Sequence, residues 1–222
     1  MANTQHRPDT DLKRSIIEEL NWTPNVDPTH IGVAVNTGMV TLSGEVSSYP
    51  EKIEAEKAAM RVFGVTGIAQ EITVRSAFGP GNDTDMARDA THAVERIPDI
   101  PAGSIKVEVH DDVVTLSGSV PWNYQRQLAA RAVRHLKGVT NVINVVSIKP
   151  TATAINIKDA ITAALLRNAI VDAQHSTVTA DAAGLVTLSG SVQSWTERQH
   201  AEQAAWAAPG VTAVVNKLHI RN

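Results

Sequence analysis

The sequence predicts an α+β protein made of three tandem repeats of an αββαβ unit, each a three-stranded mixed sheet packed by two helices. The first observation is the segment Val-Thr-Leu-Ser-Gly-x-Val, which occurs three times in the 222 residues, within 39–46, 113–120 and 185–192. Successive copies are 74 and 72 positions apart. Such regular self-similarity is the signature of a repeat architecture. The second observation is that the apolar pattern around each copy follows one order, helix, strand, strand, helix, strand.

The first repeat is expected to begin with an amphipathic helix and continue into a hairpin. Cap-type residues at 9–11 precede apolar residues at helical spacing, which are Leu12, Ile16, Ile17 and Leu20. Val33 and Val35 then alternate with small or polar residues, and a turn is predicted at 36–38 because it ends in glycine. The repeated segment continues the alternation, so it is predicted to be the second strand of the hairpin.

The second helix of the first repeat is predicted from a capping box, in which Ser48 is the N-cap and Glu51 stands three residues later. An apolar stripe follows, and Gly64 is expected to stop the helix. Alternation from 65 to 74 predicts the last strand. The same order returns in the other two repeats. The hairpin makes its two strands antiparallel, whereas the right-handed strand–helix–strand connection makes the last strand parallel to the second. Each unit is therefore expected to form a mixed sheet.

These repeats predict three domains, residues 1–78, 79–150 and 151–222. The first linker, 76–83, contains glycine and proline and is expected to be a flexible turn. The second linker, 149–154, is expected to be shorter and stiffer.

Composition limits the function classes that remain. The net charge of −3 lacks the basic excess of a sequence-independent nucleic-acid binder, so no nucleic acid is expected as a partner. No apolar run is long enough for a transmembrane segment. The chain has no cysteine, which excludes disulfides and thiolate metal sites. The polar N-terminus has no apolar stretch typical of a secretory signal. A cytoplasmic location is therefore expected, with peripheral contact to the inner membrane left open.

A pair of glycines twenty positions apart recurs in every repeat. The pairs are Gly44 and Gly64, Gly118 and Gly138, and Gly190 and Gly210. With the Val-Thr-Leu-Ser-Gly segment and a second helix rich in Glu, Arg and Ala, this pattern resembles the BON domain, named for bacterial osmotically inducible and nodulation proteins. The resemblance covers nearly all the chain and implies a cytosolic protein of three BON domains. Relatives in the cell envelope are implicated in osmotic stress, in binding anionic phospholipid surfaces and in protein quality control, whereas a cytosolic relative that couples this domain to another module is implicated in potassium binding. This chain departs from the envelope relatives because it has no signal sequence and no lipid-attachment cysteine, so their membrane role transfers poorly.

No catalytic or metal constellation is predicted. The Leu-Ser-Gly serines lack the Gly-x-Ser-x-Gly spacing of a hydrolase, and no repeat places a histidine and an acid at matching positions, so we expect no enzyme and no cofactor. The eight histidines include no His-x-x-x-His pair. His110 with Asp111 and Asp112 is the one compact set of candidate ligands, and a polar hairpin turn is favoured over a metal site there.

The second helix of the middle repeat, expected over 124–136, is the candidate interaction surface. Trp122 and Gln125 stand where the outer repeats have a serine cap and a glutamate, and no acidic residue occurs between 121 and 138. Its cations are expected to form a basic face opposite an apolar arc. With two aromatics at the helix start, that face suits anionic lipid headgroups or an acidic partner. The alternative is a solvated helix whose tryptophan covers the sheet edge. The residues of this surface are Trp122, Tyr124, Arg126, Arg131, Arg134 and Lys137.

Aromatic residues also stand at the starts of the other two second helices. Tyr49 and Trp195 are expected either to extend the interaction surface or to act as hydrophobic staples. Trp22 and Trp206 have no aromatic counterparts, so each is expected to serve local packing or an interdomain contact.

Three functions remain open from the sequence. The first is a non-enzymatic stress-response adaptor that uses its repeated domains to bind an unidentified protein partner or to self-associate. The second is peripheral binding of anionic phospholipid through the basic helix of the middle repeat. The third is binding of potassium or another small ion through backbone carbonyls.

Overall fold

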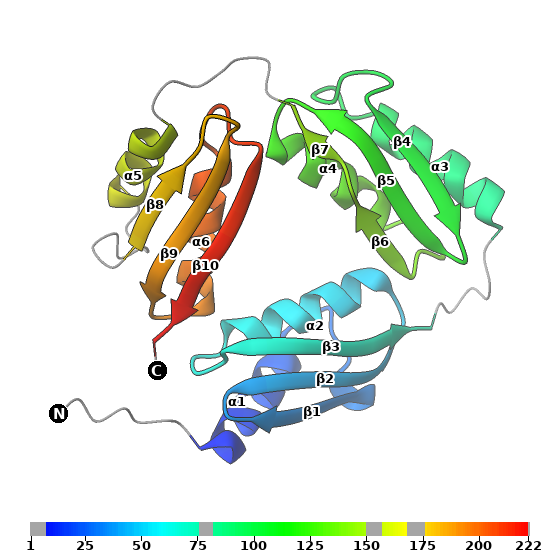
Figure 1. Ribbon diagram of the computed structural model, residues 1–222. Coiled ribbons are helices and arrows are strands. Elements are labelled where there is room, and N and C mark those ends of the chain that lie inside the picture. Colours follow the sequence, from blue (N-terminus) through cyan, green and yellow to red (C-terminus); the bar gives the residue numbers. More distant parts are fainter. Residues whose placement is uncertain (1–7, 76–81, 150–156, 168–175, 222) are drawn as a thin grey trace.

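The computed structural model describes residues 8–75, 82–149, 157–167 and 176–221 (Figure 1). These residues form three units of the predicted kind, each with two helices and a mixed sheet. The predicted domain boundaries at 78/79 and 150/151, and most of both linkers, lie outside the described residues.

The first unit follows the predicted order, with one short 3₁₀ helix before its hairpin. Its elements are α1 (Asp9–Trp22), η1 (Pro28–His30), β1 (Ile31–Asn36), β2 (Met39–Val46), α2 (Tyr49–Arg61) and β3 (Gly67–Val74).

The second and third units repeat this order. In the second unit the last strand is interrupted after Asn144, so it is divided into two short strands. The elements of the second unit are α3 (Asp83–Glu95), β4 (Ile105–His110), β5 (Val113–Val120), α4 (Asn123–Arg134), β6 (Asn141–Asn144) and β7 (Ser147–Ile148). Those of the third unit are α5 (Ile157–Arg167), β8 (Ser176–Ala180), β9 (Leu185–Val192), α6 (Trp195–Trp206) and β10 (Ala213–Ile220).

The repeated segment is the central strand of each sheet. β2 pairs antiparallel with β1 and parallel with β3, so Val40 lies opposite Val35 on one side and Ile68 on the other. Strands β5 and β9 pair in the same way within their units. Because side chains alternate along a strand, Val40 and Leu42 point into the core and are fully buried. The same alternation buries the corresponding pairs in β5 and β9.

Two helices cover one face of each sheet, and their apolar stripes close the core (Figure 1). One sequence expectation about these stripes is wrong by one helical position. Ile17 was expected in the core of the first unit, but it is exposed while Ile16 is fully buried. In the third unit Leu165 is 2% exposed and Leu166 is 68% exposed, so Leu165 occupies the core position.

The first glycine of each pair lies within a strand, and Gly64 does not stop α2 as expected. Gly44 lies inside β2, which continues to Val46, and it has a φ of 114°. A Cβ there would lie 2.0 Å from the carbonyl oxygen of His30, so the strand needs glycine where the chain entering β1 crosses it. Gly64 stands in the turn after α2, whose last residue is Arg61, and directs Val65 into the core.

The second helices of the three units meet. Helix α2 packs against α6, and α4 contacts α6 through a cation–π pair. Tyr49 at the start of α2 and Trp206 at the end of α6 both pack against the core of the second unit. Figure 1 accordingly shows α2, α4 and α6 toward the middle of the arrangement, with α3 and α5 at its outside.

Candidate functional site

The start of the second helix is built on a buried carboxylate in the outer units. In the first unit Ser48 Oγ accepts a hydrogen bond from the backbone N–H of Glu51 at 3.3 Å, as the capping box predicts. The Glu51 carboxylate does not return to the N–H of Ser48. It accepts from the N–H groups of Ser47 and Asp27, both at 2.9 Å. Glu197 of the third unit accepts from the N–H of Gln193 in the corresponding way.

The middle unit replaces this carboxylate with a buried amide for a stereochemical reason. Prolines 101 and 121 occupy the positions that correspond to Asp27 and Ser47, and proline has no N–H to donate. Gln125 Oε1 accepts instead from the N–H of Trp122 at 3.0 Å, and Gln125 Nε2 donates to the carbonyl oxygen of Asp99. The middle helix, which lacks the serine cap of the outer units, is therefore held at its start by this amide.

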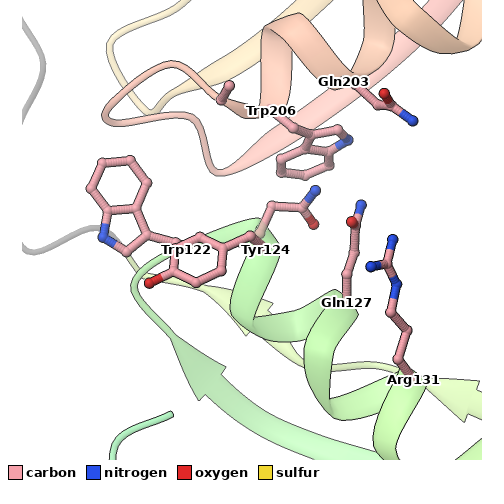
Figure 2. Close-up of a pocket in the computed structure, with 8 residues that line it drawn as sticks. Trp122, Tyr124, Gln127, Arg131, Gln203 and Trp206 are labelled. Carbon is pink, nitrogen blue, oxygen red and sulfur yellow. The ribbon is translucent and has the colours of Figure 1, made fainter. Parts of the chain in front are cut away.

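A cleft of about 610 Å³ opens between α4 and α6, at the junction of the second and third units (Figure 2). We call it the α4–α6 cleft. Three aromatic rings and several side-chain amides line it, and α4 contributes most of its wall. The lining residues are Trp122, Asn123, Tyr124, Gln127, Arg131, Gln203, Trp206 and Ala207.

Arg126 joins the two helices beside the cleft. Its guanidinium carbon lies 4.7 Å from the centre of the Trp206 ring, within cation–π range. Burial lowers the pKa of Arg126 from its ordinary value, and the charge of Glu202 on α6 opposes that shift. The corresponding Arg198 of the third unit instead donates to the carbonyl oxygens of Leu218 and Asn216 in its own sheet. The arginine at this helix position therefore contacts another unit when it belongs to α4, whereas in α6 it donates hydrogen bonds to its own sheet.

Asn123 is the least expected residue of the cleft. It is 4% exposed, and its Oδ1 has no hydrogen-bond partner among the described residues. The corresponding helix positions of the other units carry Tyr49 and Trp195. A buried acceptor without a donor costs about 1–3 kcal/mol. The middle unit therefore has an unsatisfied polar atom in the wall of a cleft, at a position where the other units place an aromatic ring.

The structure divides the predicted basic surface. Trp122, Tyr124 and Arg131 line the cleft, whereas Arg126 lies against Trp206. Arg134 is half-buried.

Lys137 is exposed and lies beyond the end of α4, which stops at Arg134 and not at the expected residue 136. It therefore does not belong to a helical face. Sequence reasoning missed the cleft residues Asn123, Gln127, Gln203 and Ala207. The absence of an aromatic at 123 is the signal that could have pointed to the first of them.

The other aromatics do not form one surface with these residues. Tyr49 packs on the second unit, and Trp195 lies under Arg198, with 4.8 Å between the guanidinium carbon and the ring centre. The interdomain contact expected of Trp206 is confirmed. The packing role expected of Trp22 is wrong, because that side chain is 82% exposed.

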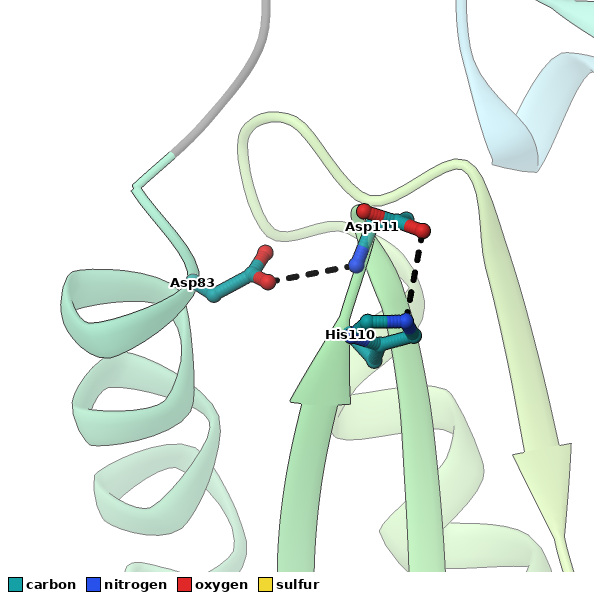
Figure 3. A group of neighbouring side chains, drawn as sticks. All are labelled: Asp83, His110 and Asp111. Atoms are coloured by element: carbon teal, nitrogen blue, oxygen red, sulfur yellow. Dashed lines mark hydrogen bonds and ion pairs between the residues drawn. The ribbon is translucent and has the colours of Figure 1, made fainter.

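Two of the three predicted candidate ligands, His110 and Asp111, meet Asp83 at the hairpin turn of the second unit, and Asp112 is not in this group (Figure 3). Asp83, His110 and Asp111 bring one potential ligand atom each within 4.8 Å of one another. Asp83 accepts hydrogen bonds from the N–H groups of Asp111 and Asp112 at 3.2 and 3.3 Å. In the first unit Asp9 binds the same turn at Thr37 and Gly38 without any histidine nearby in the turn. Binding of the turn by the first helix accounts for this cluster.

A membrane-spanning role finds no support in the helices: among the described residues, none is both long enough and apolar enough to cross a bilayer.

Comparison with known proteins places these features in a family. The model of the BON domain matches the chain three times, over residues 8–76, 82–150 and 155–222. Osmotically-inducible protein Y of Escherichia coli (strain K12) is 34% identical over 125 residues, which are 54% of this chain and 62% of that protein. The chain thus spans less than two thirds of this relative's length.

Solved structures show only weak likeness. The chain covers 91% of a structure of CdsD, a structural protein of the type III secretion system of Chlamydia trachomatis, with 94% of its own residues, a TM-score of 0.27 and 16% identity. For the periplasmic domain of PrgH the coverage is 95% of that chain and 86% of this one, with a TM-score of 0.22 and 10% identity. These scores carry no argument about function. The three family matches, which together cover most of the sequence and coincide with the three αββαβ units, show that this chain belongs to the BON-domain family.

Proposed function

We propose that this protein is a non-enzymatic binding protein of the osmotic stress response, and that the α4–α6 cleft is its binding site. The similarity to osmotically-inducible protein Y supports the link to osmotic stress. The observation that carries the binding role is the cleft itself, which lies between two units and is lined by aromatic and amide side chains. Concave sites at domain junctions with a few polar groups among aromatic rings are typical of ligand sites.

The chemistry of the lining favours binding over catalysis. Among the described residues that form the α4–α6 cleft, none is a carboxylate or an imidazole, so the wall lacks the groups that most often serve as general acids and bases. The packing of α4 on α6 gives the cleft two walls, one from each unit. A single BON unit does not have this site, which offers a reason for the tandem arrangement.

Adaptor binding of a protein partner, or self-association, stays a prediction. Support for it comes from exposed aliphatic side chains on the strands of the second and third units, Ile143, Leu185 and Val215. The cytoplasmic location, the non-enzymatic role and potassium binding likewise remain predictions of the sequence.

Growth at high osmolarity tests the proposed function. In a strain that lacks this gene, the wild-type chain and the Trp22→Ala variant are expected to restore growth equally. Trp22 is exposed, belongs to the first unit and does not line the cleft. Trp122→Ala, which removes a half-exposed cleft side chain, is expected to restore growth poorly. Circular dichroism checks that both variants are folded. Full restoration by Trp122→Ala together with Gln203→Ala would contradict a role for the cleft.

Peripheral lipid binding is the second candidate, favoured by two exposed cations, Arg131 and Lys137, near exposed Trp122 and Tyr124. If it occurs, the chain is expected to float with vesicles of anionic phospholipid at low salt and to be released at high salt. The double variant Arg131→Glu with Lys137→Glu is expected to reduce flotation several-fold. Arg14→Glu with Arg75→Glu changes the charge equally in the first unit and is the matched control. Equal flotation of the two double variants would exclude this surface.

A further inference from the structure

The side chains that line the α4–α6 cleft have a definite hydrogen-bonding character. Asn123, Gln127 and Gln203 each carry a carbonyl acceptor and an NH₂ donor, and Arg131 adds donors only. In Figure 2, Tyr124, Gln127 and Arg131 project from α4, and Gln203 and Trp206 come from α6 on the opposite side. The cleft therefore combines flat apolar rings with groups that both donate and accept.

Resting on the proposed function, we propose that the α4–α6 cleft binds a neutral sugar of one or two rings. A sugar ring has an apolar face of C–H groups that packs on aromatic side chains, here Trp122, Tyr124 and Trp206. Its hydroxyls donate and accept, as the side-chain amides do. The volume of about 610 Å³ is within the ordinary range for small-molecule sites, roughly 300–1,000 Å³.

The unsatisfied oxygen of Asn123 selects among ligand classes. Oδ1 is itself buried, so a ligand reaches it only when the Asn123 side chain turns toward the cleft, and the ligand must then bring an O–H or N–H donor to this acceptor. A carboxylate has only acceptor oxygens and a phosphate has mostly acceptor oxygens, so their negative charge would repel this atom. An acyl chain and a quaternary ammonium group have no donor at all. A sugar hydroxyl supplies the donor and removes the cost of the buried acceptor.

The charge around the cleft disfavours cations. Arg131 is in the lining and Arg126 lies beside it on Trp206, whereas no carboxylate occurs among the described lining residues. A cationic ligand would therefore meet like charge on α4. Arg126 also fixes the Trp206 ring, which provides a rigid platform for stacking.

Titration of the full chain with individual sugars tests this inference. Glucose, maltose, trehalose and sucrose are the probes, with glycine betaine, which has no donor, and inorganic phosphate, which is anionic and rich in acceptors, as the comparison ligands. Tryptophan fluorescence in a Trp22→Ala background reports on Trp122, Trp195 and Trp206, of which the first and the last line the cleft, and calorimetry gives the affinity. At least one sugar is expected to bind with a Kd of about 1 mM or tighter, in the range of a weak specific site. Betaine and phosphate are expected to bind at least tenfold more weakly.

Variants separate ligand recognition from folding. Trp122→Ala and Gln203→Ala are each expected to weaken sugar binding at least tenfold without lowering the melting temperature. Asn123→Ala removes an unsatisfied buried oxygen, so it is expected to weaken sugar binding while the melting temperature stays level or rises. A residue with a structural role alone would lower the melting temperature and leave the Kd unchanged.

Three results would overturn the inference. The first is that no sugar binds at about 10 mM, which is ten times the weakest expected Kd. The second is that phosphate or betaine binds more tightly than the sugars. The third is that the cleft variants bind sugar as tightly as the wild type. If sugars fail but Trp122→Ala still impairs growth at high osmolarity, the proposed function stands and the cleft takes another ligand, a peptide or a second copy of the chain included. If sugars bind but growth is unaffected by the cleft variants, the proposed function fails and the site remains.

Discussion

Replacing Gly118 with alanine is expected to destabilise the middle unit by about 3–5 kcal/mol, which is enough to unfold a small domain. Gly118 has a φ of 119°, a conformation that residues with a Cβ rarely adopt. The added Cβ would lie 2.1 Å from the carbonyl oxygen of Ser104. That carbonyl accepts a hydrogen bond from the N–H of Ser119 at 3.0 Å, so it cannot move away without breaking the pairing at the start of β4.

Gly103→Ala is the matched control for this prediction. Gly103 belongs to the same unit and also has a positive φ, 71°, but nothing lies within 4 Å of an added Cβ. Only backbone strain remains, and a loss of about 1–2 kcal/mol is expected. Urea unfolding followed by tryptophan fluorescence and circular dichroism measures both variants. Equal losses would show that the close approach to Ser104 is unimportant.

Gln125→Glu is expected to cost the middle unit about 3 kcal/mol near neutral pH, because it buries a carboxylate whose usual donors are absent. In the first unit the Glu51 carboxylate accepts from two N–H groups, whereas the corresponding positions of the second unit are Pro101 and Pro121. The new carboxylate would face the carbonyl oxygen of Asp99, to which Gln125 now donates.

The pH dependence of the stability loss tests whether the buried carboxylate causes it. Burial with the Trp122 N–H as donor but beside the carbonyl oxygen of Asp99 raises the pKa of the carboxyl introduced at position 125 in the folded state above its unfolded value of about 4.3. A raised folded pKa means that the variant is relatively stable below about pH 4 and loses stability as the pH rises through the folded pKa. The deficit relative to the wild type is therefore expected to shrink on acidification.

Restoring the donors is the control for this second prediction. Adding Pro101→Ala and Pro121→Ala to Gln125→Glu supplies two N–H groups, as in the first unit, and is expected to recover much of the lost stability at neutral pH. The two proline replacements in the wild-type background correct for their own effect on the unfolded chain. A loss of stability that does not change with pH and is not reduced by the two proline replacements would contradict this explanation.

Much of the fold could be predicted because its signals are local. The alternation that buries Val40 and Leu42, and the Ser48 cap of α2, depend on neighbours a few residues away. The errors occur where distant contacts decide. Helical spacing alone does not tell Leu165 from Leu166 as the core residue, and the need for glycine at position 44 comes from His30, a neighbour in space.

The candidate site was predictable only in part. Trp122, Tyr124 and Arg131 stood out because the middle helix departs from its two copies, and all three line the cleft. The role of Arg126 depends on its contact with Trp206, which is 80 positions away in the sequence and belongs to another unit. A helical wheel gives the face on which a cation lies but does not show what packs against it.

The three repeats, the order of their elements and the family can be read from the amino-acid pattern, because periodicity, caps and glycines act over short distances. The way in which the units meet cannot be read from that pattern and is seen only in the folded protein. It joined the start of α4 to the end of α6, turned a predicted basic surface into one wall of a cleft and left Asn123 Oδ1 unsatisfied there. The physical reason is that packing between units depends on the shape and charge of surfaces distant in sequence, which no spacing along the chain encodes.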